Sequence, residues 1–232
     1  AANYVADSGD ANDRNPNTGG FMTDNSEGNI TSQLAYGNKQ WGLAAGYRYG
    51  QCGAKFRTGT EYAKSGKWGT PCTVTKDDGS KVRSGADSHS WALNAFWRPE
   101  DSGILPSVSA GVGASYLNGN SAWENNTSKR AMASWMVGLT WNDVFMEGNA
   151  LGAAVGQPQF VTEVDNNGGD DFVADGNYAM ELWYKFQVTD NIAVTPAVYW
   201  LSRPYGDDTQ NFKGDDKSLG VFGGLIQTTF KF

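Results

Sequence analysis

The sequence lacks any long apolar run. No stretch of its 232 residues approaches the roughly 18 consecutive apolar residues that a membrane-spanning helix needs. The mean hydropathy of −0.51 is in the range of soluble proteins. These absences exclude helical membrane spans, but not β-barrels, in which only every second residue of a strand must be apolar.

Residue types that carry catalysis or bind nucleic acid are also scarce. His89 is the only histidine, and no nucleophile elbow, Walker loop or zinc-ligand spacing accompanies it. The formal net charge of −7 opposes electrostatic binding to nucleic acid. We therefore expect neither an enzyme nor a nucleic-acid partner, and no cofactor.

Cysteine is limited to Cys52 and Cys72, which share one polar segment and form no Cys-x-x-Cys pattern. One disulfide bond, formed in an oxidising compartment, is the simplest prediction. On the chain-entropy model such a bond contributes about 3 kcal/mol to stability. Two free thiols are the alternative.

Alternation of apolar and other residues is the dominant pattern that the sequence does contain. Segments such as 41–49, 91–97 and 108–116 place apolar side chains at every second position. Their length of about ten residues is what a tilted strand needs to cross a bilayer. Pro158 and Pro196 fall inside two of the expected strands, where each removes a backbone donor and predicts a bulge or a bend.

Aromatic residues often mark both ends of these apolar faces. The chain contains 9 tryptophans, 10 tyrosines and 11 phenylalanines, and Trp91 and Trp97 bracket one strand as interfacial girdles do. A soluble β-sandwich also alternates, but nothing in it requires aromatic residues at both strand ends. The predicted fold class is therefore all-β, a transmembrane antiparallel β-barrel.

The connections between the expected strands alternate in length. Short turns occupy 37–40, 99–105, 142–149 and 189–191, whereas 50–88, 118–129, 163–176 and 204–217 are longer and polar. Short turns at one end and long loops at the other are typical of outer-membrane barrels. The parity covers roughly nine strands, and bacterial barrels have even strand numbers. We therefore expect residues 1–232 to be the C-terminal part of a larger porin barrel, with upstream strands outside this chain.

Several segments resemble a known family. Residues 134–139, 149–162, 175–192 and 194–204, together with the Phe-Lys-Phe end, are similar to the cyanobacterial branch of the carbohydrate-selective porin (OprB) family. The resemblance covers roughly residues 29–232. It implies an outer-membrane barrel of about sixteen strands, often trimeric, that passes small solutes passively. It also implies a cell-wall-binding domain, which we expect to lie outside this chain.

Alternation assigns a set of charged side chains to the barrel interior. The expected pore-lining residues are Arg48, Arg98, Glu181, Lys185, Arg203 and Lys231. An aqueous lumen accommodates charges that lipid would penalise by about 2–4 kcal/mol near its midplane. Because rings of side chains set pore selectivity, this mainly basic lining favours anions or electron-rich sugar hydroxyls. The alternative is that these charges only hydrate the barrel wall.

The long connections are acidic. Asp165, Asp170, Asp171 and Asp175 lie close together in the sequence, and carboxylate oxygens are the ligands that Ca²⁺ prefers. Their spacing does not match an EF-hand, and acidic external loops are usually solvated. No metal site is predicted, and these aspartates are kept as calcium candidates.

The resulting hypothesis is a passive outer-membrane channel for inorganic ions and small hydrophilic solutes. Its expected partners are outer-membrane lipid, the permeating solutes, further copies of the chain in a homotrimer, and the barrel-assembly machinery, which reads a terminal aromatic residue such as Phe232. The alternative is a structural or adhesive outer-membrane protein whose plugged barrel displays acidic loops.

Overall fold

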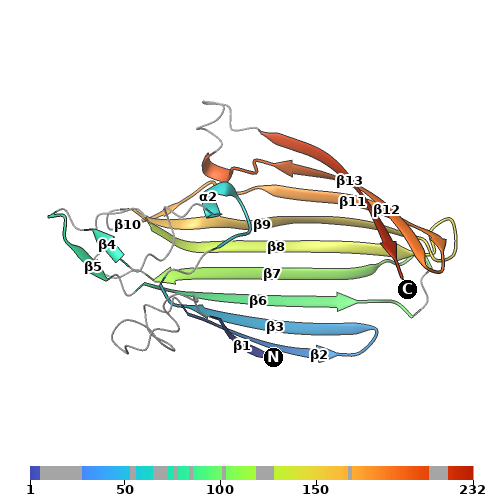
Figure 1. The fold of residues 1–232 in the computed structure, drawn as a ribbon, viewed down its shortest axis with the longest axis horizontal. Coiled ribbons are helices and arrows are strands. Elements are labelled where there is room, and N and C mark those ends of the chain that lie inside the picture. The colour runs from blue at the N-terminus through green and yellow to red at the C-terminus, as the bar shows by residue number, and fades with distance from the viewer. Residues whose placement is uncertain are drawn as a thin grey trace.

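The computed structural model describes residues 1–5, 28–52, 56–64, 73–75, 78–83, 86–100, 103–118, 128–166, 169–208 and 219–231. These residues form one antiparallel sheet of 11 strands in the order β1-β2-β3-β6-β7-β8-β9-β11-β12-β13, with β10 paired to β9 (Figure 1). The strands of this sheet are β1 (Ala2–Val5), β2 (Asn29–Gly37), β3 (Trp41–Gly50), β6 (Asp87–Trp97), β7 (Ser107–Asn118), β8 (Ser128–Asn142), β9 (Ala150–Asn166), β10 (Gly169–Phe172), β11 (Tyr178–Thr189), β12 (Ile192–Ser202) and β13 (Gly220–Phe230).

This architecture confirms the predicted all-β antiparallel class. The sandwich alternative is wrong, because the long strands follow one another in a single sheet rather than in two packed sheets. The remaining elements lie in the long connections: α2 (Glu61–Lys64), β4 (Thr73–Thr75), β5 (Lys81–Arg83) and the 3-10 turn η4 (Gly206–Asp208). Within the described ranges, no helix is long and apolar enough to cross a membrane.

The two ends of the sheet differ as the connection lengths predict. Figure 1 shows the short turns at one end of the long strands, whereas β4, β5, β10 and α2 gather toward the other end. Residues 2–5 form β1, which pairs with β2 in register Tyr4↔Ile30. In the described sheet β1 and β13 are the two edges.

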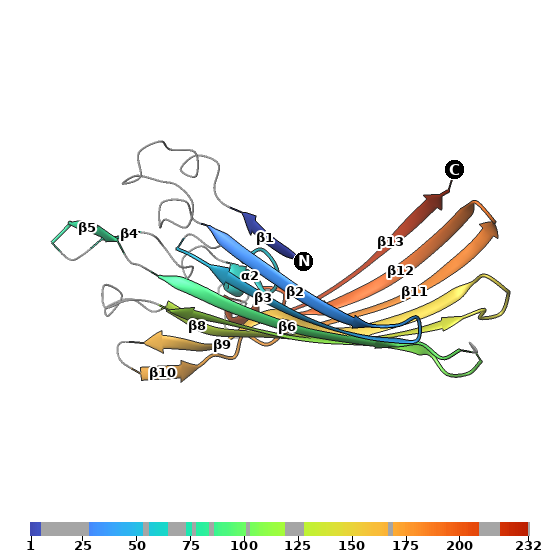
Figure 2. The ribbon, with the colours of Figure 1, turned by 90° about the horizontal axis from the view of Figure 1, so that it is seen from below.

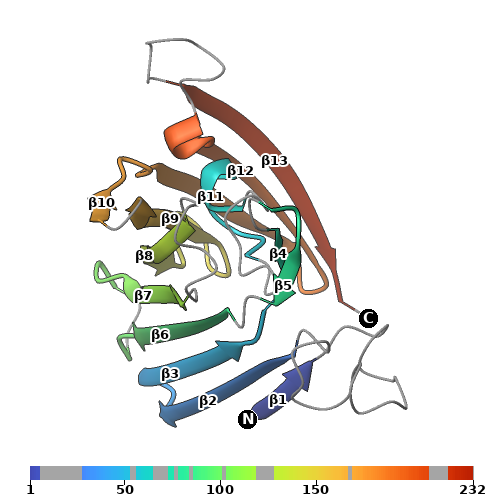
Figure 3. The same cartoon turned by 90° about the vertical axis from the view of Figure 1, so that its left-hand side faces the viewer.

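The sheet is strongly curved, so its two faces are not equivalent. Figures 2 and 3 show the strands bending around a concave side on which α2 lies. Residues that face one another across antiparallel strands share a face. The register Arg48↔Ser90↔Ser115↔Met132 therefore belongs to the concave inner face, and the neighbouring register Tyr47↔Trp91↔Ala114↔Ala133 to the convex outer face.

Among the described residues, the outer face carries a band of exposed large apolar side chains. The exposed members at central strand positions include Leu34, Leu43, Leu93, Val112, Leu182, Val198 and Ile226. An apolar band on the outside of a curved antiparallel sheet is what the hydrocarbon region of a bilayer requires. The strands thus place their apolar residues outward, as alternation predicts.

A β-bulge interrupts the register near Pro158. Ala133 lies opposite Phe160, whereas Trp135 lies opposite Gln157, so β9 has one residue more than β8 over this stretch. Proline cannot donate to the ladder, and bulges are among the few sheet positions that accept it. This bulge confirms the expectation for Pro158. Pro196, by contrast, lies opposite Ile226 in a β12–β13 register without a shift.

Candidate functional site

Residues 56–64, named here the inward segment, fold back onto the inner face of the sheet (Figure 3). Tyr62 and Ala63 of α2 are buried in an apolar cluster with inner-face residues of β7, β8 and β9. These partners are Leu117, Met132, Val161 and Val164, and Phe56 and Val173 pack against the cluster. A hydrophobic core therefore lies inside the curve of the sheet, where the segment narrows the space that the strands enclose.

The inward segment approaches β9 at a glycine. Gly59 has a φ of +107°, and a Cβ atom there would lie 1.9 Å from the carbonyl oxygen of Gln159. Only glycine adopts this conformation at such a close approach without strain. The next residue, Thr60, donates its backbone N–H to the same carbonyl at 3.0 Å. Thr60 also caps α2, because its Oγ1 accepts from the backbone N–H of Ala63 at 2.9 Å.

Asp175 anchors the inward segment to two other parts of the chain. Its side chain is fully buried, with 0% exposure. Oδ2 accepts from Thr60 Oγ1 and from the backbone N–H of Val161, each at 2.7 Å, and Oδ1 accepts from the backbone N–H of Asp207 at 2.9 Å. A buried carboxylate is stable only when donors of this kind compensate for its lost hydration. The carboxylate thus joins the inward segment, β9 and the turn η4.

Backbone bonds strengthen the same junction. The N–H groups of Glu61 and Tyr62 donate to the carbonyl oxygens of Pro204 and Tyr205 at 3.0 and 3.3 Å. Gly206 has a φ of +62°, and a Cβ atom there would lie 1.7 Å from Asp175 Oδ1. The tight turn around the carboxylate therefore requires glycine at this position.

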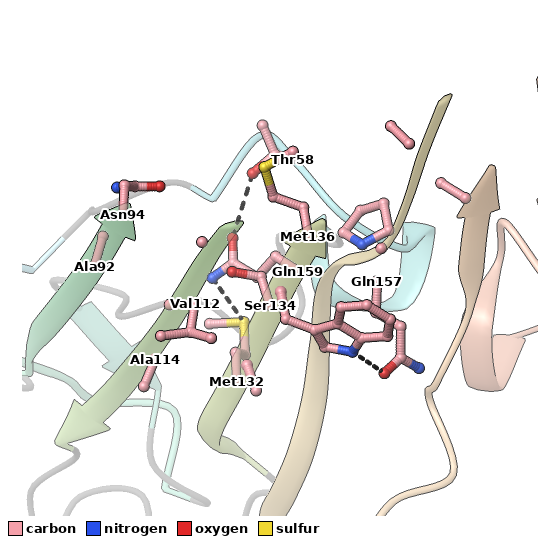
Figure 4. Close-up of a pocket in the computed structure, with 18 of the residues that line it drawn as sticks. Thr58, Ala92, Asn94, Val112, Ala114, Met132, Ser134, Met136, Gln157 and Gln159 are labelled. Atoms are coloured by element: carbon pink, nitrogen blue, oxygen red, sulfur yellow. Dashed lines mark hydrogen bonds between the residues drawn. The ribbon is translucent and has the colours of Figure 1, made fainter. Parts of the chain in front are cut away.

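A cavity of about 730 Å³ lies between the inward segment and the inner face. Figure 4 shows Thr58 of the segment above Gln159, whose side chain reaches toward Met132. The polar lining also includes Arg48, Asn94 and Glu181. The cavity is therefore bounded by Phe56 and Thr58 of the segment and by a mixture of apolar, small and polar residues of the sheet.

Two of the six charged residues that are predicted to line the pore lie at this cavity. Arg48 and Glu181 both line it. The Arg48 guanidinium donates from Nε and Nη2 to Asn29 Oδ1 at 3.0 and 2.5 Å and lies 5.6 Å from the ring centre of Phe56. Arg48 therefore contacts the inward segment as well as the cavity.

The other predicted charges are spread along the strands. Lys185 lies on β11 two register positions from Trp183, toward the short-turn end. Arg98 follows β6, with its guanidinium 5.2 Å from the ring centre of Phe96. Lys231 follows β13, and its backbone N–H donates to the carbonyl oxygen of Asn191 at 2.9 Å. Asn191 Nδ2 donates in turn to the carbonyl oxygen of Lys231 at 2.7 Å.

Arg203 has a different environment from the other five. Its guanidinium donates to the carbonyl oxygens of Gly176, Ala174 and Gly206 at 3.0, 2.9 and 3.2 Å. These carbonyls belong to the chain on either side of the Asp175 junction. Arg203 thus ties the connections together, and a direct contribution to the pore lining remains a prediction.

Three aromatic side chains of the inner face lie over glycines of neighbouring strands. The pairs are Phe96 over Gly42, Trp183 over Gly152 and Tyr199 over Gly223, where a Cβ atom on the glycine would lie 2.4, 2.0 and 2.4 Å from the ring. Because each ring occupies the space that a side chain would fill, it lies against the sheet rather than projecting across the lumen. The sequence alone predicts that these rings point inward, but not that glycines receive them.

Of the four calcium candidates, only Asp175 has a described side chain, so a calcium site formed by the set stays a prediction. The carboxylate of Asp175 is already occupied by the three donors named above. Asp165 and Asp170 lie opposite one another in the β9–β10 register, and Asp171 lies opposite Val164. In the part of the chain that the structure describes, no group of three or more His, Cys, Asp or Glu residues is arranged to hold a metal ion.

Cys52 is buried and disulfide-bonded. Cys72 lies outside the described residues, so the Cys52–Cys72 pairing stays a prediction.

Sequence reasoning missed the inward segment and the role of Asp175. The available signal was short: Gly59 followed by Thr60 and Glu61 is a glycine turn with a helix cap and an acidic first turn. It lies within a polar connection of nearly forty residues, and no local pattern says which face of the sheet such a connection covers.

Comparison with known proteins finds similar sequences and a solved structure. The alr4550 protein of Nostoc sp. is 30% identical over 224 residues, which is 96% of this chain and 34% of that protein. The sll0772 protein of Synechocystis sp. is 30% identical over 132 residues, which is 56% of this chain and 21% of that protein. The chain thus spans about a third of the length of the first relative. A solved structure, OmpT, an outer membrane protein of Vibrio cholerae, matches with a TM-score of 0.48 and 12% identity over 91% of this chain and 58% of its own.

The family comparison covers almost the whole chain. The model of "Carbohydrate-selective porin, OprB family" matches residues 3–232. This range includes every strand of the outer apolar band and the inward segment on the inner face. The chain belongs to the carbohydrate-selective porin, OprB family, and forms transmembrane β-barrel structure of the outer membrane.

Proposed function

We propose that the protein is a passive diffusion channel for inorganic ions and small hydrophilic solutes, in which the inward segment limits the size of what passes. The observation that carries this proposal is the anchoring of the segment on the inner face by Asp175. A pore needs no reaction cycle: water fills the space beside the segment, and solutes diffuse through it. The polar lining by Arg48, Asn94 and Glu181 supports a hydrated path.

The charges of the inner face support a modest preference for anions. Arg48, Arg98, Lys185 and Lys231 are basic, whereas Glu181 is the one acid among the predicted lining residues. Fixed charges near a narrow path attract ions of opposite sign over about a Debye length, roughly 8 Å at physiological ionic strength. Among these charges we expect Arg48 to influence permeation most, because it lies beside the inward segment.

The same proposal includes the assembly of the whole protein. We propose that residues 1–232 form the C-terminal part of the barrel and that further strands pair with the edges β1 and β13. A homotrimer and recognition of the C-terminal aromatic residues by the barrel-assembly machinery belong to this proposal as well.

Single-channel recording in planar bilayers tests the size-limiting role. In Asp175→Ala the backbone N–H groups of Val161 and Asp207 lose their acceptor, at about 1–3 kcal/mol for each unsatisfied donor. The inward segment should then leave the inner face, and conductance should rise with noisier openings. Asp207→Ala is the matched control, because Asp207 contributes only its backbone N–H to the junction.

The possible outcomes separate the hypotheses. Steps of unchanged conductance in Asp175→Ala, with a normal circular dichroism spectrum, would remove the size-limiting role but leave the pore. Pure wild-type protein that inserts without any conductance steps would instead favour the structural or adhesive alternative with a plugged barrel.

A second candidate function is passage of sugars, and one observation favours it. Trp183 and Tyr199 lie over glycines on the inner face, with Glu181 and Lys185 at neighbouring inner positions of β11. A flat ring flanked by an acid and a base offers stacking and hydrogen bonds to a sugar. Liposome swelling with monosaccharides and with inositol, for wild type and Trp183→Ala, tests it. If wild type and Trp183→Ala gave the same swelling rate with each monosaccharide and with inositol, a sugar-specific role for this ring would be excluded.

A further inference from the structure

Five ring-bearing side chains form a continuous cluster on the outer face near the long-loop ends of β3, β6 and β7. This outer-rim cluster consists of Tyr47, Tyr49, His89, Trp91 and Tyr116. The strand register places them together: Tyr49 lies opposite His89, His89 opposite Tyr116, and Tyr47 opposite Trp91. Since long loops of outer-membrane barrels are extracellular, the cluster lies where the outer leaflet meets its head groups.

The rings of the outer-rim cluster contact one another in sequence. His89 and Trp91 are nearly parallel, with 6.0 Å between ring centres and 16° between planes. Tyr47 lies 5.6 Å from Trp91, Tyr49 lies 5.3 Å from His89, and Trp91 meets Tyr116 edge-on at 5.7 Å. Trp91 and Tyr116 remain 46% and 51% exposed, so their ring surfaces are available to a ligand outside the barrel.

Polar groups border these rings. The hydroxyl of Tyr47 lies 2.7 Å from His89 Nδ1, and the imidazole Nε2 lies 3.6 Å from Asp87 Oδ1. Asp87 Oδ1 also accepts from Asn118 Nδ2 at 2.7 Å. The side chains of His89 and Asp87 are 29% and 28% exposed, so each can still reach a ligand.

The opposite rim of the same strands has rings without these polar partners. There Trp41 lies opposite Trp97, and Tyr36 meets Trp41 edge-on at 5.7 Å. The outer-face positions beside them, Leu43 and Ala95, are apolar. An aromatic belt at a membrane interface accounts for this second rim. It does not account for an acid and an imidazole on the lipid-facing side of the first.

We propose that the outer-rim cluster binds a sugar ring in the head group of lipopolysaccharide in the outer leaflet. Exposed indole and phenol rings stack on the C–H face of a sugar, while a carboxylate accepts and an imidazole N–H donates hydrogen bonds to its hydroxyls. Neither the five rings nor their described polar neighbours Asp87 and Asn118 include Lys or Arg, the residues that bind phosphate. The sugar, rather than the phosphate, is therefore the recognised part of the lipid.

The test measures how much lipopolysaccharide the full-length protein retains. Protein is reconstituted in vesicles of phospholipid with fluorescently labelled lipopolysaccharide, extracted in mild detergent and assayed for bound label. Trp91→Leu removes the stacking ring and Asp87→Ala removes the carboxylate acceptor, and Trp97→Leu at the other rim is the matched control. We expect retention to fall roughly two- to tenfold in the first two variants, as for loss of one ring or hydrogen-bond contact, and to stay unchanged in the control.

Dephosphorylated lipopolysaccharide supplies the second arm. Equal retention of the phosphorylated and dephosphorylated forms by wild type would support sugar recognition, and loss of the dephosphorylated form would overturn it. The proposal would also be overturned if Trp91→Leu and Asp87→Ala retained as much lipopolysaccharide as wild type. An equal loss in Trp97→Leu would overturn it too, because a general aromatic belt predicts that result. Circular dichroism of every variant establishes that the barrel has folded.

Discussion

The inner and outer faces of the sheet are built from alternate residues of the same strands, yet they are organised in different ways. On the outer face large apolar side chains stay uncovered, as at Leu93, which is 59% exposed. On the inner face Met132 and Val161 are buried in one cluster with Tyr62 and Ala63 of the inward segment. The stability of the outer face depends only on its side chains being apolar, because any lipid tail can cover them. The inner face depends on specific partners.

That difference extends to hydrogen bonds. The Asp175 junction on the inner side has a defined acceptor for each donor, and the two glycines that permit it have no room for a side chain. The central outer positions of β6 and β7 carry no polar side chain that would need such a partner. We therefore expect substitutions on the outer face to act through hydrophobicity, and those on the inner face through fit and charge.

Introducing a charge at two adjacent positions tests the difference between the faces most strongly. Leu93 points outward near the middle of β6, and its neighbour Ala92 points inward to the cavity. Arginine facing lipid near the midplane costs about 2–4 kcal/mol. Leu93→Arg should lower the unfolding free energy in phospholipid vesicles by that amount, whereas Ala92→Arg should change it by less than about 1 kcal/mol. Urea titration of the refolded full-length protein measures both.

The assignment of faces would fail if the two arginine variants lost equal stability, or if Ala92→Arg lost more. A larger effect at Ala92 would mean that β6 presents its even-numbered residues to lipid.

Most of the sheet could be predicted because apolar side chains recur at every second residue of its strands. A strand with alternating residues has only two faces, so the outward position of Leu93 follows from its apolar neighbours at every second residue, whatever lies beside the strand. The same reasoning identified the short and long connections, and it located the Pro158 bulge from the missing backbone donor. The inward direction of Arg48 also followed from it.

The inward segment could not be predicted in this way, because it depends on contacts between parts of the chain far apart in sequence. Asp175 and Thr60 are separated by 115 residues, and the acidic neighbours of Asp175 favoured a solvated loop or a calcium site instead. Arg203 was assigned inward by alternation, but whether its guanidinium meets water or backbone carbonyls depends on how the connection after β12 folds. Local periodicity carries no information about the Asp175–Thr60 contact or about the surroundings of the Arg203 guanidinium.

A smaller effect is expected where an aromatic ring fills the space above a glycine. In Gly152→Ala the new Cβ would lie 2.0 Å from the ring of Trp183, so the ring must leave the sheet surface. Overpacking of this kind typically costs about 1–3 kcal/mol. Gly46→Ala is the control on the same face, because its Cβ would meet nothing closer than 3.9 Å. Urea titration gives the stability, and the emission maximum of tryptophan reports the displaced ring.

Loss of stability in both glycine variants would indicate a general requirement for glycine in these strands. No loss in either would mean that Trp183 moves freely, and the inner face would then be less specific than its contacts suggest.

The smallest expected effect concerns a single charge in the aqueous space. Lys185→Glu reverses a charge on the inner face of β11, and the proposed anion preference should weaken. Lys39→Glu, in the short turn after β2, is the control at an exposed position outside the sheet. Reversal potentials in a KCl gradient measure the preference. The shift should shrink as salt rises, because the Debye length falls from about 10 Å at 0.1 M to about 3 Å at 1 M. A shift of equal size in both variants would place the selectivity at the mouth of the pore, whereas a shift confined to Lys185→Glu would place it along the inner face.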